Sequence, residues 1–75
     1  MGNPTTRPGL AKRSVTLAGH RTSVALEPEF WAALEALAAD QGVALAALVA
    51  GVDASRPAGQ PLASALRLAA LRRRT

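Results

Sequence analysis

The chain has 75 residues and a formal net charge of +4, and 49% of its residues are hydrophobic. A chain of this length forms one domain at most and buries little surface alone, so we expect a partner chain to complete its core. It has no cysteine and one histidine, His20, which excludes disulfides and thiolate metal sites and predicts no metal or other cofactor.

The same shortage of reactive groups argues against catalysis. One histidine without a cysteine cannot assemble a nucleophile with its base and an orienting partner, so we do not expect an enzyme. No stretch reaches 18 consecutive apolar residues, and no basic leader precedes an apolar run. These patterns predict a cytoplasmic protein.

Charge is unevenly distributed along the chain. No acid occurs before Glu27, and no Lys or Arg lies between that residue and Asp53. The basic residues of the front are Arg7, Lys12, Arg13 and Arg21, and those of the tail are Arg56, Arg67, Arg72, Arg73 and Arg74. A basic front suits phosphate binding by an N-terminal element, although solubility alone also explains such charge.

The N-terminal third predicts an arm and a strand. Residues 1–11 hold two prolines and two glycines, which indicates a disordered N-terminal arm before a domain over residues 12–75. In RTSVAL (residues 21–26) apolar or β-branched residues alternate with others, which predicts one short strand. Thr22, Val24 and Leu26 share one face of this strand, and Arg21, Ser23 and Ala25 share the other.

Three helices are expected after the strand. Pro28 suits a first turn and Gly42 a C-terminal stop, so the first helix is predicted at about 28–41, with an apolar stripe that includes Phe30 and Leu34. The second begins just after Gly42, with Ala44 where a capping side chain is usual. Pro61 then begins a third helix over residues 61–73.

A lone strand leaves backbone groups unpaired, and two arrangements satisfy them. The strand pairs with its copy in another chain, or SVTL (residues 14–17) folds back on it as a hairpin through Ala18, Gly19 and His20. The first arrangement gives a mostly α intertwined homodimer with an intermolecular two-stranded antiparallel ribbon. In that dimer, residues 12–20 form an extra strand or an arm along the DNA.

The segment RTSVALEPEFWAALEALAADQGVALAALVA resembles the ribbon-helix-helix (MetJ/Arc-like) DNA-binding superfamily, and KRSVTLAGHRTSVALEPEFWAAL resembles its short bacterial members with a GHRTSV-LE-FW string. The resemblance covers about residues 12–73. It implies a homodimer that inserts its ribbon into the major groove of double-stranded DNA, where arginine bonds guanine and serine several base edges. Two departures are Ala25, at a usually polar contact position, and Ala44, at a usual Ser or Thr cap.

These arguments assign three groups of site residues. The resemblance puts Arg21, Ser23 and Ala25 at the base-contacting positions and the helix start at Val43, Ala44 and Leu45 on a phosphate, while Lys12 and Arg13 are expected to contact phosphates as basic residues of the front. The expected dimer core comprises Thr22, Val24, Leu26, Phe30, Leu34, Leu48 and Val49.

The leading hypothesis is therefore a sequence-specific DNA-binding regulator, most simply a repressor. A second is an antitoxin-like interaction module whose C-terminal helix binds a protein partner. A third, which SVTL and RTSVAL keep open, is a monomer with a hairpin that binds something other than DNA.

Overall fold

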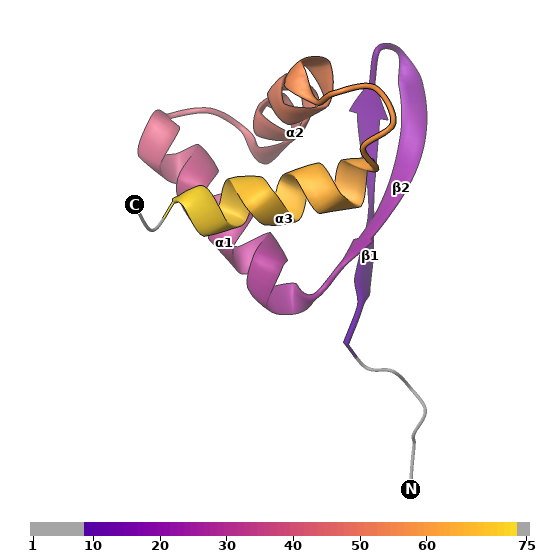
Figure 1. Ribbon diagram of the computed structural model, residues 1–75. Coiled ribbons are helices and arrows are strands. Elements are labelled where there is room, and N and C mark those ends of the chain that lie inside the picture. The colour runs from indigo at the N-terminus through magenta and orange to yellow at the C-terminus, as the bar shows by residue number, and fades with distance from the viewer. Residues whose placement is uncertain (1–8, 74–75) are drawn as a thin grey trace, which may run out of the picture.

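The computed structural model describes residues 9–73, which form a two-stranded antiparallel hairpin followed by three helices (Figure 1). The strands are β1 (Ala11–Leu17) and β2 (His20–Leu26), and the helices are α1 (Pro28–Gln41), α2 (Leu45–Ser55) and α3 (Leu62–Arg72). All three helices lie on one side of the hairpin, where α2 packs against β1 and α3 against β2. No part of residues 9–73 covers the opposite side of the hairpin (Figure 1).

A two-residue turn joins the strands. Ala18 and Gly19 both have positive φ angles, 51° and 83°, as in a type I′ turn, whose twist matches that of the flanking strands. The register runs from Leu17 opposite His20 to Ala11 opposite Leu26. The expectation of one strand per chain is therefore wrong. The short turn returns the first segment to its own chain at little entropic cost, so β2 has an intrachain partner.

The boundaries at the N-terminal arm and at α3 also differ from expectation. Residues 1–8 of the predicted arm lie outside the described residues, but Ala11 is the first residue of β1. Pro61 is the N-cap of α3 and not its first residue, and the helix ends at Arg72. No helix within residues 9–73 is by itself long and apolar enough to cross a membrane; α1 and α2 are so only together, with a bend of 98° between them.

The end of α1 agrees with the prediction. Gly42 has a φ of 71° and donates its amide hydrogen to Ala39 O, while the Val43 amide donates to Ala38 O. These two bonds form a Schellman motif, which satisfies carbonyls that the helix itself cannot pair. The motif ends α1 at Gln41 and turns the chain toward α2.

The core lies between the hairpin and the helices. Leu26, Leu34, Val49 and Leu66 are fully buried there, one from β2 and one from each helix. Trp31 is 1% exposed and joins α1 to β1, since its Nε1 donates a 2.7 Å hydrogen bond to Ala11 O. The Trp31 indole is thus the largest side chain in the core and the contact that holds the start of β1.

The turn gives a test of the hairpin. Ala18 adopts a left-handed conformation that costs a residue with a β-carbon roughly 1 kcal/mol, whereas asparagine adopts it readily. Ala18→Asn should therefore raise the free energy of unfolding by about 0.5–1 kcal/mol, measured by urea denaturation. Gly19→Ala should lower it by a similar amount. Equal stability of all three proteins would contradict the turn.

Candidate nucleic-acid interface

The uncovered face of the hairpin carries side chains from both strands. Side chains alternate between the two faces of a strand, and the register places alternate residues of β1 opposite those of β2. The pairs that share the outward face are Lys12 with Ala25, Ser14 with Ser23, and Thr16 with Arg21. All are exposed except Ala25, which is half-buried. The expected base-contacting set thus shares one face with three residues of β1, of which Ser14 and Thr16 were not predicted.

Arg13 belongs to the opposite face. It is paired with Val24, whose side chain is buried under the helices. The Arg13 guanidinium lies 4.9 Å from the Trp31 ring centroid, and its Nη1 is 2.7 Å from Glu35 Oε2. Lys12 and Arg13, which sequence reasoning grouped together, therefore point in opposite directions, and the contacts of Arg13 hold β1 on α1.

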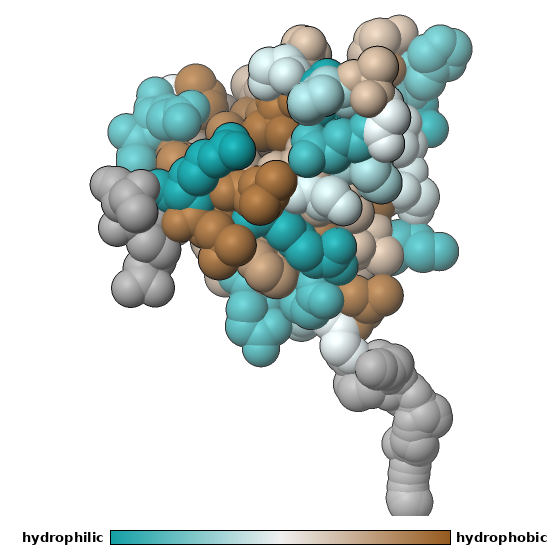
Figure 2. Space-filling view, in the orientation of Figure 1, coloured by the Kyte–Doolittle hydropathy of each residue, from teal (hydrophilic) through white to brown (hydrophobic). Residues whose placement is uncertain are grey.

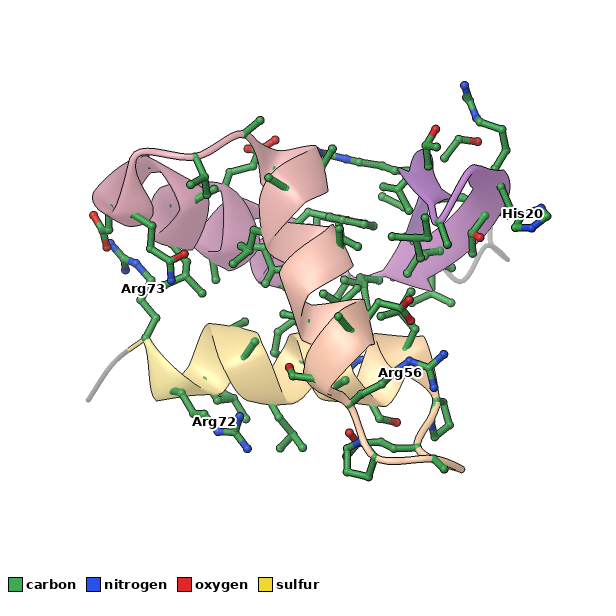
Figure 3. The ribbon with its side chains drawn as sticks, turned by 90° about the horizontal axis from the view of Figure 1, so that it is seen from above. His20, Arg56, Arg72 and Arg73 are labelled. Carbon is green, nitrogen blue, oxygen red and sulfur yellow. The ribbon has the colours of Figure 1, made fainter. Side chains whose placement is uncertain are left out.

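Four of the five carboxylates have arginine partners on the helical side. Besides Arg13 with Glu35, the pairs are Arg56 with Asp53, Arg67 with Glu27, and Arg73 with Asp40, each with an N–O distance of 2.8–3.0 Å. Figure 3 shows Arg73 reaching from the end of α3 toward α1, while His20 projects from the tip of the hairpin away from the helices. These pairs neutralise four arginines of the helical side.

Lys12 and Arg21, by contrast, form no ion pair or hydrogen bond with any other residue in the range 9–73. The hydroxyls of Ser14, Thr16 and Ser23 likewise have no protein partner in that range. The outward face of the hairpin therefore presents two unneutralised cations and three free hydroxyls, with no acid among its six residues. This is the composition of a surface that binds polyanions.

The start of α2 has backbone amides without a capping side chain. Ala44 is the N-cap, as predicted, and makes no side-chain hydrogen bond. The Val43 amide is already bonded to Ala38 O, so it cannot serve the phosphate role predicted for it. The amides of Ala44 and Leu45 make no bond outside the helix within the described chain. The amides available for an anion therefore begin one residue later than expected.

The residues expected in a dimer core pack within the single chain. Val24, Leu26, Leu34, Leu48 and Val49 are buried there. Thr22 and Phe30 are half-buried, and the Arg67 guanidinium lies 5.8 Å from the Phe30 ring centroid. Trp31, and not Phe30, is the aromatic residue of the core, because the hairpin approaches α1 on the Trp31 side.

The outer edge of β2 pairs with no other strand of the described chain. Leu17 and His20 close the two-residue turn and form a hydrogen-bonded pair. Along an antiparallel ladder such pairs alternate with pairs that are not hydrogen-bonded to each other, so Arg21, Ser23 and Ala25 belong to the second kind. The backbone groups of Arg21, Ser23 and Ala25 consequently point away from β1 along this edge. An edge of this kind is a template for pairing with another strand.

A comparison of the chain with models of known protein families identifies its family. The model of the ribbon-helix-helix domain matches residues 10–73, which is most of the chain and includes both strands and all three helices. The chain belongs to the ribbon-helix-helix domain family. This family consists in general of DNA-binding regulators, typically without enzymatic activity, that bind DNA as dimers. No curated protein and no solved structure shows significant similarity to the chain.

The junction between β2 and α1 gives a pH-dependent prediction. A hydrogen bond from Arg67, and then one from its own backbone amide, lower the pKa of Glu27 below its ordinary value of 4.5. Because the pKa of Glu27 is lower in the folded than in the unfolded state, the Glu27–Arg67 contact stabilises the fold fully at pH values above the ordinary pKa of 4.5. This stabilisation is lost as the pH falls through the lowered pKa. Arg67→Met should return the Glu27 pKa toward 4.5 in an NMR titration, whereas Arg56→Met should leave it unchanged.

Proposed function

We propose that this ribbon-helix-helix protein is a sequence-specific DNA-binding transcriptional regulator, a repressor that blocks an operator by occupying it. The observation that carries the proposal is the charge distribution. The carboxylates of the helical side neutralise arginines there, while Lys12 and Arg21 on the outward hairpin face have no acidic partner. An antiparallel ribbon with this face is of a size that the major groove admits.

The roles of the β2 residues follow from their chemistry. Arg21 is suited to bidentate bonding with guanine O6 and N7, and Ser23 to several base edges. Ala25 offers a methyl contact to thymine and no hydrogen bond, so specificity at its position is weaker. The Lys12 ammonium and the amides of Ala44 and Leu45 contact phosphates. Arg13 and Val43 are left out, because the Arg13 side chain and the Val43 amide already have protein partners.

The homodimer of this proposal forms along the free edge of β2. Antiparallel pairing of β2 with its copy, centred on Ser23, uses all the unpaired backbone groups from Arg21 to Ala25. The intermolecular ribbon is then β2 with its copy, and β1 is the extra strand on each side. The intrachain hairpin is compatible with this dimer because a strand has two edges, and β1 occupies one.

Substitution of Arg21 tests base recognition. A binding site is first selected from a pool of random duplexes, and the affinities for that site and for random DNA are then measured by fluorescence anisotropy. Arg21→Ala should weaken binding to the selected site by about 1–3 kcal/mol and random DNA less. An equal loss on both would make Arg21 a phosphate contact and would refute its base-contacting role.

Cysteine cross-linking tests the dimer edge, since the chain has no native cysteine. Two Ser23 residues opposite each other would have Cα atoms about 5.5 Å apart, within the range for a disulfide. Ser23→Cys should therefore form covalent dimers on mild oxidation. Ser14→Cys, directly across the hairpin, should not, because the two β1 strands lie on opposite outer edges. Cross-linking through Ser14→Cys alone would place the dimer on β1 and contradict the proposal.

A second candidate function is binding of a protein partner through α3, as in an antitoxin. Ala65, Leu66 and Ala70 bury one side of α3 against its own chain, so a partner would contact the other side. There Leu68 is 41% exposed and lines a pocket of about 330 Å³, and Leu71 is 57% exposed. Figure 2 shows apolar atoms gathered over this helix. Co-purification with the product of a neighbouring reading frame, abolished by Leu71→Asp and retained by Arg21→Ala, would favour this function.

A further inference from the structure

The outward side chains of β1 have no role in the fold. Lys12, Ser14 and Thr16 are exposed, and their side chains form no hydrogen bond or ion pair within the described chain. Their inward neighbours differ, because Val15 and Leu17 are buried and Arg13 is bonded to Glu35. Packing therefore explains every second residue of β1 and leaves the three outward residues unexplained.

The chemistry of these three residues is uniform. An ammonium and two hydroxyls are hydrogen-bond donors of the kind that contact phosphate oxygens. Lys12 stands opposite Ala25, whose short side chain leaves the ammonium free to extend outward. No acidic residue lies on this face to compete for it. The row is thus a continuous set of donors along one strand.

The width of the ribbon indicates which part of DNA the row would meet. In the proposed dimer the strand order is β1, β2, β2 of the second copy, β1 of the second copy. Adjacent strands lie about 4.8 Å apart, so the two outer strands are roughly 14 Å apart. The major groove is about 12 Å wide. The two central strands therefore fit within the groove, and each β1 lies over one of its phosphate walls.

We propose that β1 is a phosphate-binding strand, in which Lys12, Ser14 and Thr16 contact the sugar–phosphate backbone on either side of the groove contacted by β2. The inference rests on the proposed function and adds Ser14 and Thr16 to its interface. The two strands of one hairpin thus have different roles in binding. β2 supplies the contacts that distinguish base sequence, and β1 supplies contacts that are independent of it.

The test compares three variants with the parent protein on the selected site and on a random duplex, at several salt concentrations. The variants are Lys12→Gln, the double variant Ser14→Ala/Thr16→Val, and the inward control Arg13→Gln, all checked for unchanged folding by circular dichroism. Lys12→Gln should weaken binding to both DNAs by the same factor. It should also reduce the salt slope, which is the slope of log affinity against log salt concentration, by about 1. The double variant should weaken both equally, by roughly three- to tenfold for each hydrogen bond removed, at unchanged slope.

Two results would overturn the inference. A loss for Ser14→Ala/Thr16→Val on the selected site but not on random DNA would mean that β1 contacts bases, as it would if a single hairpin entered the groove. No loss on either DNA, or a loss no larger than that of Arg13→Gln, would mean that β1 does not touch DNA. If these variants bind normally while Arg21→Ala loses the selected site, the inference alone fails. If the parent protein shows no salt-dependent binding, the proposed function fails as well.

Discussion

The register of the β1–β2 hairpin determines which residues are available for function. Side chains alternate along a strand, so a shift of one residue would exchange the buried face with the outward one. The turn at Ala18 and Gly19 sets this register, and the packing of Val24 and Leu26 under the helices maintains it. The outward position of Arg21 and Ser23 is thus a consequence of the packing of Val24 and Leu26, which lie one to five residues further along the same strand.

The contacts at α1 and the charge distribution depend on the same register. Arg13 reaches Trp31 and Glu35 because it lies on the inward face, whereas Lys12 lies on the outward one. The exposed ion pairs of the helical side contribute little stability individually. Their larger effect is on the electrostatic field of the molecule, since they neutralise arginines that lie away from the open hairpin face and leave net positive charge on that face.

Local signals predicted the helices well, because they depend on neighbouring residues. Pro28 and Gly42 mark the ends of α1, and Ala44 is the uncapped start of α2. The partner of β2 could not be predicted, because Ala18-Gly19 is a weaker turn signal than Asn-Gly and a strand pairs equally well with its own chain or a copy. The separation of Lys12 from Arg13 and the bonded state of the Val43 amide both depend on tertiary contacts. Arg21, Ser23 and Ala25 were grouped correctly on one face by alternation alone, and their contacts with DNA stay a prediction.

The most direct test of this account is an NMR titration of the ¹⁵N-labelled protein with a short DNA duplex at low salt. The account predicts that amide shifts concentrate on the outward residues of β1 and β2 and on Ala44 and Leu45 at the start of α2. The amides around Leu68 and Leu71 on α3 should change little. Shifts concentrated on α3, or no shifts on the hairpin at any DNA concentration, would contradict the claim that the open hairpin face binds DNA.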